Sequence, residues 1–166
     1  MTPTVIRAGA LRGTLEVANH GYTHCVLQDG MFRPRLFHGN RPFHREFYDW
    51  LPEAAHWEHV NRAQGILQDY LGRPVVTFVP PGNVFTRVTL VAAAAAGLRF
   101  VSCLEPERWG TSEGLTFVGG GDVVAIHDRD LVLGGPARLR QVLAEHTGAP
   151  FGTVREIGDL VARRLP

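Results

Sequence analysis

The sequence predicts an α/β fold with a largely parallel sheet, and three features support this. Short apolar segments of strand length alternate along the chain with segments of helical periodicity. One continuous succession of strand, turn, helix and strand runs from Val75 to Cys103, which is the pattern of a βαβ unit. Polar segments that contain histidine, proline or asparagine follow several of the predicted strands, where α/β folds collect their functional groups.

The first half of the chain is predicted to hold a short strand, a long loop and a long helix. The strand covers residues 15–18, and the segment 29–43 lacks any period and is predicted to be a loop. Pro52 suits the first turn of a helix, and Gly72 followed by Pro74 predicts its end. The apolar residues at helical spacing between them are Trp57, Val60, Ala63, Ile66, Leu67 and Leu71.

The second half continues this alternation up to the last helix. Apolar runs of strand length predict strands over 75–79, 98–103, 115–118 and 123–126. Helices are predicted over 86–96 and 136–146. Thr153 and Glu156 have the spacing of a capping box, which predicts a final helix with Ile157, Leu160, Val161 and Leu165 on its inner face.

Composition and length exclude several classes of protein. A chain of 166 residues is expected to form a single domain over 1–166. The formal net charge of +1 and the absence of a basic, aromatic-rich stripe argue against a nucleic-acid partner. No apolar run is long enough to predict a transmembrane segment, and no signal peptide is visible, so the chain as given is expected to be cytoplasmic.

His20 and His24 are the strongest candidates for functional residues. They lie four positions apart directly after the strand predicted over 15–18, so both imidazoles can turn toward one point and present neutral nitrogen ligands to zinc. Two ordinary surface histidines in a loop would explain the pair equally well if it stood alone. The segments that follow two later strands, 80–83 and 127–128, are expected on the same rim of the sheet.

Together these segments resemble the polysaccharide deacetylase, or NodB-homology, family (similar to carbohydrate esterase family 4), in its divergent branch with His-Gly-Tyr-Thr-His. The resemblance implies an incomplete or distorted (β/α) barrel with largely parallel strands. It also implies that His20 and His24 bind a divalent metal, most often zinc, and that His127 is the general acid. Asp128 would either orient His127 or face solvent. The residues implied to line the substrate groove are Pro80, Pro81, Gly82 and Asn83.

The family's first motif, a strand that ends in Asp-Asp, has no counterpart in this sequence. That motif supplies the catalytic base and the third metal ligand, but only nineteen residues precede His20 and none of them is aspartate. Val79 also stands where many members carry an arginine. Either the sequence begins late and lacks the first strand, or the chain has lost its base. Candidate replacements for the carboxylate are Asp29, Glu46 and Asp49.

The resemblance implies a metal-dependent hydrolase that removes acyl groups, such as N-acetyl, from a carbohydrate. The alternative is a non-catalytic module that binds carbohydrate or assists assembly, so whether the chain is an enzyme stays open at this stage. Trp50 and Trp109 lie near loops where they could stack on a sugar, whereas Trp57 is expected in the core. The remaining histidines are expected to have no functional role: His38, His44, His56, His59 and His146.

A missing first strand also predicts self-association. The strand over 15–18 would lose a neighbour and expose an unpaired edge, through which a homo-oligomer could form.

Overall fold

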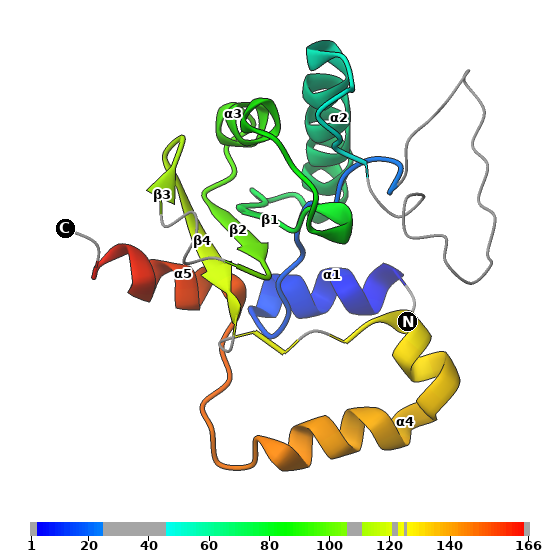
Figure 1. Cartoon of the computed structure of the whole chain (residues 1–166). Coiled ribbons are helices and arrows are strands. Elements are labelled where there is room, and N and C mark those ends of the chain that lie inside the picture. Colours follow the sequence, from blue (N-terminus) through cyan, green and yellow to red (C-terminus); the bar gives the residue numbers. More distant parts are fainter. Residues whose placement is uncertain (1–2, 25–45, 106–110, 121–122, 125, 165–166) are drawn as a thin grey trace.

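The computed structural model describes residues 3–24, 46–105, 111–120, 123–124 and 126–164 (Figure 1). Its helices and strands, in chain order, are α1 (Pro3–Arg12), α2 (Glu53–Leu71), β1 (Thr77–Phe78), α3 (Arg87–Ala95), β2 (Phe100–Cys103), β3 (Thr111–Ser112), β4 (Leu115–Gly119), α4 (Asp128–Glu145) and α5 (Val154–Ala162). A short 3-10 turn (Pro81–Asn83) follows β1.

The strands form one open sheet in the order β1-β2-β4-β3. Its first three strands are parallel, and β3 pairs antiparallel with β4. A single parallel bridge between Asn19 and Phe78 extends the sheet by one residue beyond β1. The prediction of an α/β fold with a largely parallel, incomplete barrel is therefore confirmed.

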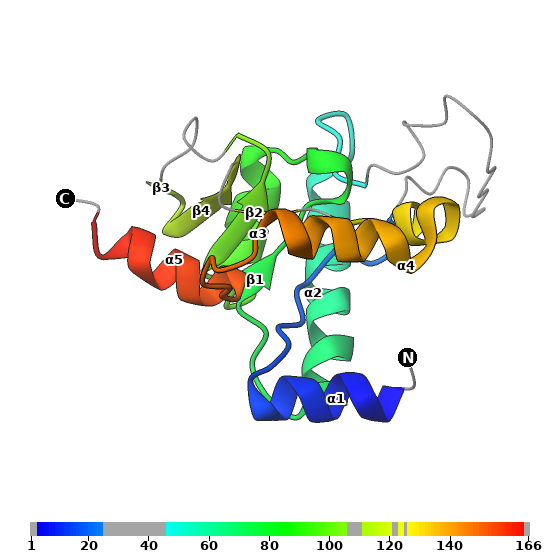
Figure 2. The same ribbon diagram turned by 90° about the horizontal axis from the view of Figure 1, so that it is seen from below.

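Helices cover both faces of this sheet. Figures 1 and 2 show α2 and α3 on one face and α5 on the other. Side chains of β2 alternate between the faces: Val101 belongs to the main core with Val60 and Leu90, whereas the ring of Phe100 lies against Gly158 of α5. The helix α5 therefore packs on the face that a closed barrel would turn inward.

Three helices form where the sequence predicts them, and local signals explain their ends. The helix α2 ends at Gly72, whose φ of 65° is the left-handed conformation that glycine adopts at low cost. Thr86 caps α3 and Thr153 caps α5, each with a reciprocal capping box. The capping box predicted at Thr153 and Glu156 is thus confirmed.

Several sequence predictions are wrong. The strand predicted over 15–18 is reduced to the bridge at Asn19, and none of the described residues of 123–126 lies in a strand. The sequence did not predict α1 or the first half of α4, because neither segment has a clear apolar stripe. The helix α4 begins at Asp128 and bends at Gly135, directly before Pro136. The predicted loop 29–43 and Leu165 lie outside the described residues.

Two residues assigned to inner helix faces are exposed instead. Ile66 of α2 is 55% exposed and Leu160 of α5 is 54% exposed. In α5 the buried position is Gly158, since only a residue without a side chain lets the helix approach Phe100 closely. Periodicity predicted both helices and most of the α2 residues that meet the core, but not the exposure of Ile66 and Leu160 or the close approach at Gly158.

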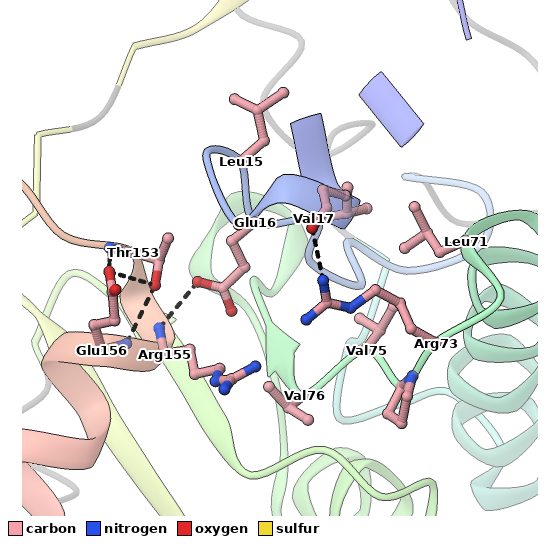
Figure 3. Close-up of a pocket in the computed structure, with 13 residues that line it drawn as sticks. Leu15, Glu16, Val17, Leu71, Arg73, Val75, Val76, Thr153, Arg155 and Glu156 are labelled. Atoms are coloured by element: carbon pink, nitrogen blue, oxygen red, sulfur yellow. Dashed lines mark hydrogen bonds between the residues drawn. The ribbon is translucent and has the colours of Figure 1, made fainter. Parts of the chain in front are cut away.

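A cavity of about 200 Å³ lies between the end of α1, the segment 15–17 and the start of α5 (Figure 3). The carboxylate of Glu16 crosses this region, accepting hydrogen bonds from the Thr77 hydroxyl and from the backbone N–H of Arg155 at 2.9 Å. These bonds dock the N-terminus of α5 against the sheet. Neither His20 nor His24 lines the cavity.

No helix in the described ranges is long and apolar enough to cross a membrane.

Candidate metal site at the histidine pair

The structure brings His20 and His24 together just beyond the bridge at Asn19. Their ring centroids lie 4.7 Å apart and the ring planes are inclined by 56°. Both residues are exposed. The arrangement is the one expected of two ligands that share a metal, although neighbouring rings alone do not require one.

The ring of His20 is oriented by the backbone of the strand end beside it. Its Nδ1 lies 2.5 Å from the carbonyl oxygen of Val79. Because a carbonyl only accepts, Nδ1 carries the hydrogen and donates it. The lone pair is therefore on Nε2. In a metal-binding histidine the other ring nitrogen usually donates a hydrogen bond, often to a backbone carbonyl, and this bond orients the ring.

Asn19 connects the start of the histidine loop (residues 20–24) to the helix α2. Its side chain is buried; Oδ1 accepts the backbone N–H of Gly21 at 3.0 Å. Its Nδ2 donates to the carbonyl of Val60 and to Oε1 of Gln64, each at 3.1 Å. The loop therefore starts from a position fixed by the core.

Glu46 binds the rest of the histidine loop through its backbone. The buried carboxylate accepts N–H groups from Tyr22 and His24, each at 2.9 Å, and from Thr23 at 3.2 Å. Nδ1 of His59, on α2, donates to the same carboxylate at 2.6 Å. Four donors thus converge on one side chain.

The pKa of Glu46 reflects two opposing effects. Burial raises it, but the hydrogen bonds from His59 and from the backbone of residues 22–24 outweigh burial and hold the pKa below its usual value. Glu46 is therefore ionised at neutral pH, and its negative charge favours the loop conformation that directs three N–H groups toward it.

The groove segment predicted after β1 lies next to the histidine loop. A Cβ placed on Gly21 would come within 3.2 Å of the Pro81 ring. Pro80 and Pro81 are buried, whereas Gly82 and Asn83 are exposed. Oδ1 of Asn83 accepts the backbone N–H of Leu104 at 3.1 Å. The histidine loop and the segment 80–83 are therefore neighbours, and the end of β2 adjoins that segment.

A third ligand is not found among the residues that the structure describes. No group of three or more histidine, cysteine, aspartate or glutamate side chains within those ranges could hold a metal ion. Of the candidate replacements, Glu46 is engaged by the loop, Asp49 is exposed, and Asp29 lies outside the described residues.

His127 is exposed and directly precedes α4, which begins at Asp128. The Asp128 side chain lies outside the described part of the chain. Because the strand predicted to deliver these residues is not formed, their roles as general acid and orienting group stay predictions.

The tryptophans and remaining histidines divide into several cases. Trp50 is 56% exposed and stacks on Tyr48, with ring centroids 5.3 Å apart and planes inclined by 22°. Trp57 packs against the core as predicted, and Trp109 lies outside the described residues. His38 and His44 also lie outside the described residues, while His146, directly after α4, donates to the carbonyl of Val142 in that helix.

His56 and His59, expected to have no functional role, each make specific hydrogen bonds in the structure. His56 is buried; its Nε2 donates to the Tyr48 carbonyl at 3.1 Å and its Nδ1 accepts the Thr89 hydroxyl at 2.9 Å. His59 supports Glu46. Sequence reasoning missed the Glu46–His59 pair, because its partners are distant in the chain and only the fold brings them together.

The fold and the histidine pair define an open α/β protein with two candidate metal ligands at the strand ends. The sequence model of the polysaccharide deacetylase family matches residues 1–101, and the chain belongs to that family. The matched region contains the histidine loop, Glu46, His59 and the segment 80–83, and it ends before His127.

The other comparisons add less. No match was found among curated proteins. Among solved structures, the chain resembles the deacetylase domain of BpsB from Bordetella bronchiseptica, with 20% sequence identity and a TM-score of 0.47. That similarity covers 72% of this chain and 50% of the BpsB domain, so the chain spans about half the length of that structure.

Proposed function

We propose that this protein is a metal-dependent hydrolase that removes acyl groups, such as N-acetyl, from a carbohydrate. The observation that carries the proposal is the orientation of His20 by the Val79 carbonyl beside the ring of His24, in a chain of the polysaccharide deacetylase family. The donor set, two imidazoles, fits zinc.

His20 and His24 would hold the metal. A zinc ion bound there supplies a Lewis acid and lowers the pKa of a bound water to about 7. His127 would protonate the departing amine, as a general acid. A carboxylate base and a third ligand are still required, and the described residues contain no group of three or more possible metal ligands.

A carbohydrate substrate is supported by the exposed surface close to the loop. Tyr48 and Trp50 form a stacked aromatic pair two and four residues after Glu46, and aromatic rings of this kind can pack on sugar rings. Gly82 and Asn83 are exposed beside the histidine loop and would form part of the groove.

The second candidate is a non-catalytic carbohydrate-binding or assembly module of the same fold. The observation that favours it is the lack of a three-residue metal cluster within the described ranges. Two histidines without a third protein ligand bind zinc less tightly than a complete catalytic set.

Zinc binding and hydrolysis distinguish the two candidates. The test compares the wild-type protein with a His20→Asn, His24→Asn variant, because asparagine keeps a side-chain donor at position 20 and tolerates the positive φ of 57° at position 24. We expect zinc to bind the wild type only, and deacetylation of N-acetylglucosamine oligomers to require it. Equal zinc content in both proteins would overturn the metal site. Zinc or oligomer binding without hydrolysis would favour the second candidate.

A further inference from the structure

We infer that Glu46 and His59 act as a clamp that sets the conformation of the histidine loop and thereby positions both candidate ligands. We call these two residues the Glu46–His59 clamp. The contacts in the structure support the role of the clamp in setting the loop conformation, whereas its effect on metal binding rests on the proposed function. Both members of the clamp are positioning residues, since each acts through the loop.

The first argument is the convergence of backbone donors on Glu46. The N–H groups of Tyr22, Thr23 and His24 are consecutive, and all three lie 2.9–3.2 Å from its carboxylate oxygens. Consecutive N–H groups point to one place only in a tightly curved backbone, which forms a concave site for an anion. An ionised carboxylate buried at that place stabilises the curved backbone conformation of residues 22–24.

The second argument is the conformation that the loop must adopt at its two ends. Gly21 has φ of 77° and His24 has φ of 57°. A positive φ is unusual for a residue other than glycine and requires support from its surroundings. The bond from the His24 N–H to Glu46 gives that support at the ligand itself.

The third argument concerns His59, which ties the clamp to the core. His59 lies on α2 one residue before Val60, whose carbonyl binds Asn19 at the other end of the loop. The side chain of His59 is only 14% exposed, and that of Glu46 is fully buried. One rigid helix therefore holds the loop from both ends.

The same contacts show why Glu46 is a positioning residue and not the missing ligand. Oε1 accepts from Tyr22, Thr23 and His59, and Oε2 accepts from Thr23 and His24. Turning either oxygen toward a metal would break hydrogen bonds that these partly buried N–H groups and His59 make to the carboxylate, which is costly.

The first experiment measures the loop directly and needs no metal. Amide hydrogen exchange of Tyr22, Thr23 and His24 is compared between the wild type and Glu46→Gln, which keeps the shape but removes the charge and one acceptor oxygen. The control is Glu53→Gln, the same change at an exposed position in the first turn of α2. We expect these three amides to exchange about tenfold faster or more in Glu46→Gln and unchanged in the control. Equal exchange in all three proteins would overturn the clamp.

The second experiment measures the effect on the ligands. Zinc affinity is determined by competition with a chromogenic chelator, and the geometry by the visible spectrum of the cobalt(II) form. His59→Asn retains a donor that can reach Glu46, whereas His59→Leu removes it. We expect zinc to bind about 10- to 100-fold more weakly to Glu46→Gln and to His59→Leu than to the wild type, and the cobalt spectrum of both variants to be altered. The His59→Asn variant should retain most of the wild-type zinc affinity.

The outcomes separate the clamp from the proposed function. If the variants bind zinc as the wild type does, with the same cobalt spectrum, the positioning role is wrong although the metal site stands. If the wild type binds no zinc but its loop amides are protected and released by Glu46→Gln, the clamp is confirmed and the proposed function fails. Should Glu46→Gln not fold, the two His59 variants decide both measurements.

Discussion

The Nδ1 atom of His20 lies 2.5 Å from the carbonyl oxygen of Val79. This contact joins the histidine loop to the end of β1 at the position where many family members carry an arginine. The backbone carbonyl of Val79 orients the ring of His20, and this role does not depend on which side chain stands at position 79.

This hydrogen bond predicts a difference between two replacements of His20. In His20→Asn the side-chain amide can still donate to Val79, whereas His20→Leu leaves the carbonyl to solvent. We expect His20→Leu to be about 1 kcal/mol less stable than His20→Asn, and both to lose zinc. Urea unfolding followed by circular dichroism checks the stability. Equal unfolding midpoints would show that the contact contributes nothing to folding.

Gly21→Ala should destabilise the protein by about 1–3 kcal/mol. The backbone has φ of 77°, and an added Cβ would lie 2.1 Å from Oε2 of Glu46, so the change strains the loop and displaces the carboxylate. Gly65→Ala is the matched control, because Gly65 is an exposed position within α2 with open space around it. That change should stabilise by about 0.5–1 kcal/mol. A Gly21→Ala protein as stable as the wild type would contradict the loop geometry.

His56 makes stability depend on pH near neutrality. Burial lowers its pKa, and the charge of His59 acts in the same direction, against the hydrogen bond to Tyr48. In the unfolded chain the imidazole binds a proton below about pH 6.5, while in the folded protein it stays neutral to a lower pH. The unfolded state then binds more protons, so stability is fully present above pH 6.5 and is lost as the pH falls toward the folded pKa.

The measurement is the free energy of unfolding between pH 5 and 8, for the wild type and His56→Gln. We expect the wild type to lose at most about 1.4 kcal/mol per pH unit through this group, and the variant to show a flatter profile at lower overall stability. The control is His146→Gln, at the end of α4. Identical slopes in the wild type and in His56→Gln would argue against the shifted pKa.

Gly158→Ala tests whether α5 belongs on the inner face of the sheet. A Cβ at this position would lie 2.3 Å from Cδ1 of Phe100, so the helix or the ring must move, at a cost of about 1–3 kcal/mol. Val161→Ala, at a partly exposed position of the same helix, should have a smaller effect. If Gly158→Ala unfolds at the same denaturant concentration as the wild type, α5 is not packed there.

Self-association remains a prediction, with a changed structural basis. The segment 15–18 forms no strand, and the sheet ends beyond β1 at the single bridge of Asn19. Asn19 donates to the Thr77 carbonyl and accepts the Val79 N–H, each at 2.8 Å, so an unpaired edge would lie along the segment 15–18 and not along β1. Sedimentation velocity over a wide concentration range should show species larger than the monomer, and a single monomer peak throughout would contradict the prediction.

The sequence predicted those parts of the structure that depend on neighbours along the chain. Gly72 predicted the end of α2, Thr153 and Glu156 predicted the capping box of α5, and the apolar runs predicted β2 and β4. The histidine pair was found by its spacing together with the segments that follow two later predicted strands. These signals are local because a cap, a turn or a short strand is stabilised within a few residues.

Tertiary structure alone decided which predicted strands find a partner and what supports the site. Val123 and Val124 have strand composition but lie outside any strand, because composition does not supply a pairing partner. The bonds of Glu46 to His59 and to the histidine loop join residues 13 to 24 positions apart. No periodicity encodes such contacts. They exist because the fold brings the Glu46 carboxylate, the His59 ring and the backbone of residues 22–24 together, and not because of any sequence motif.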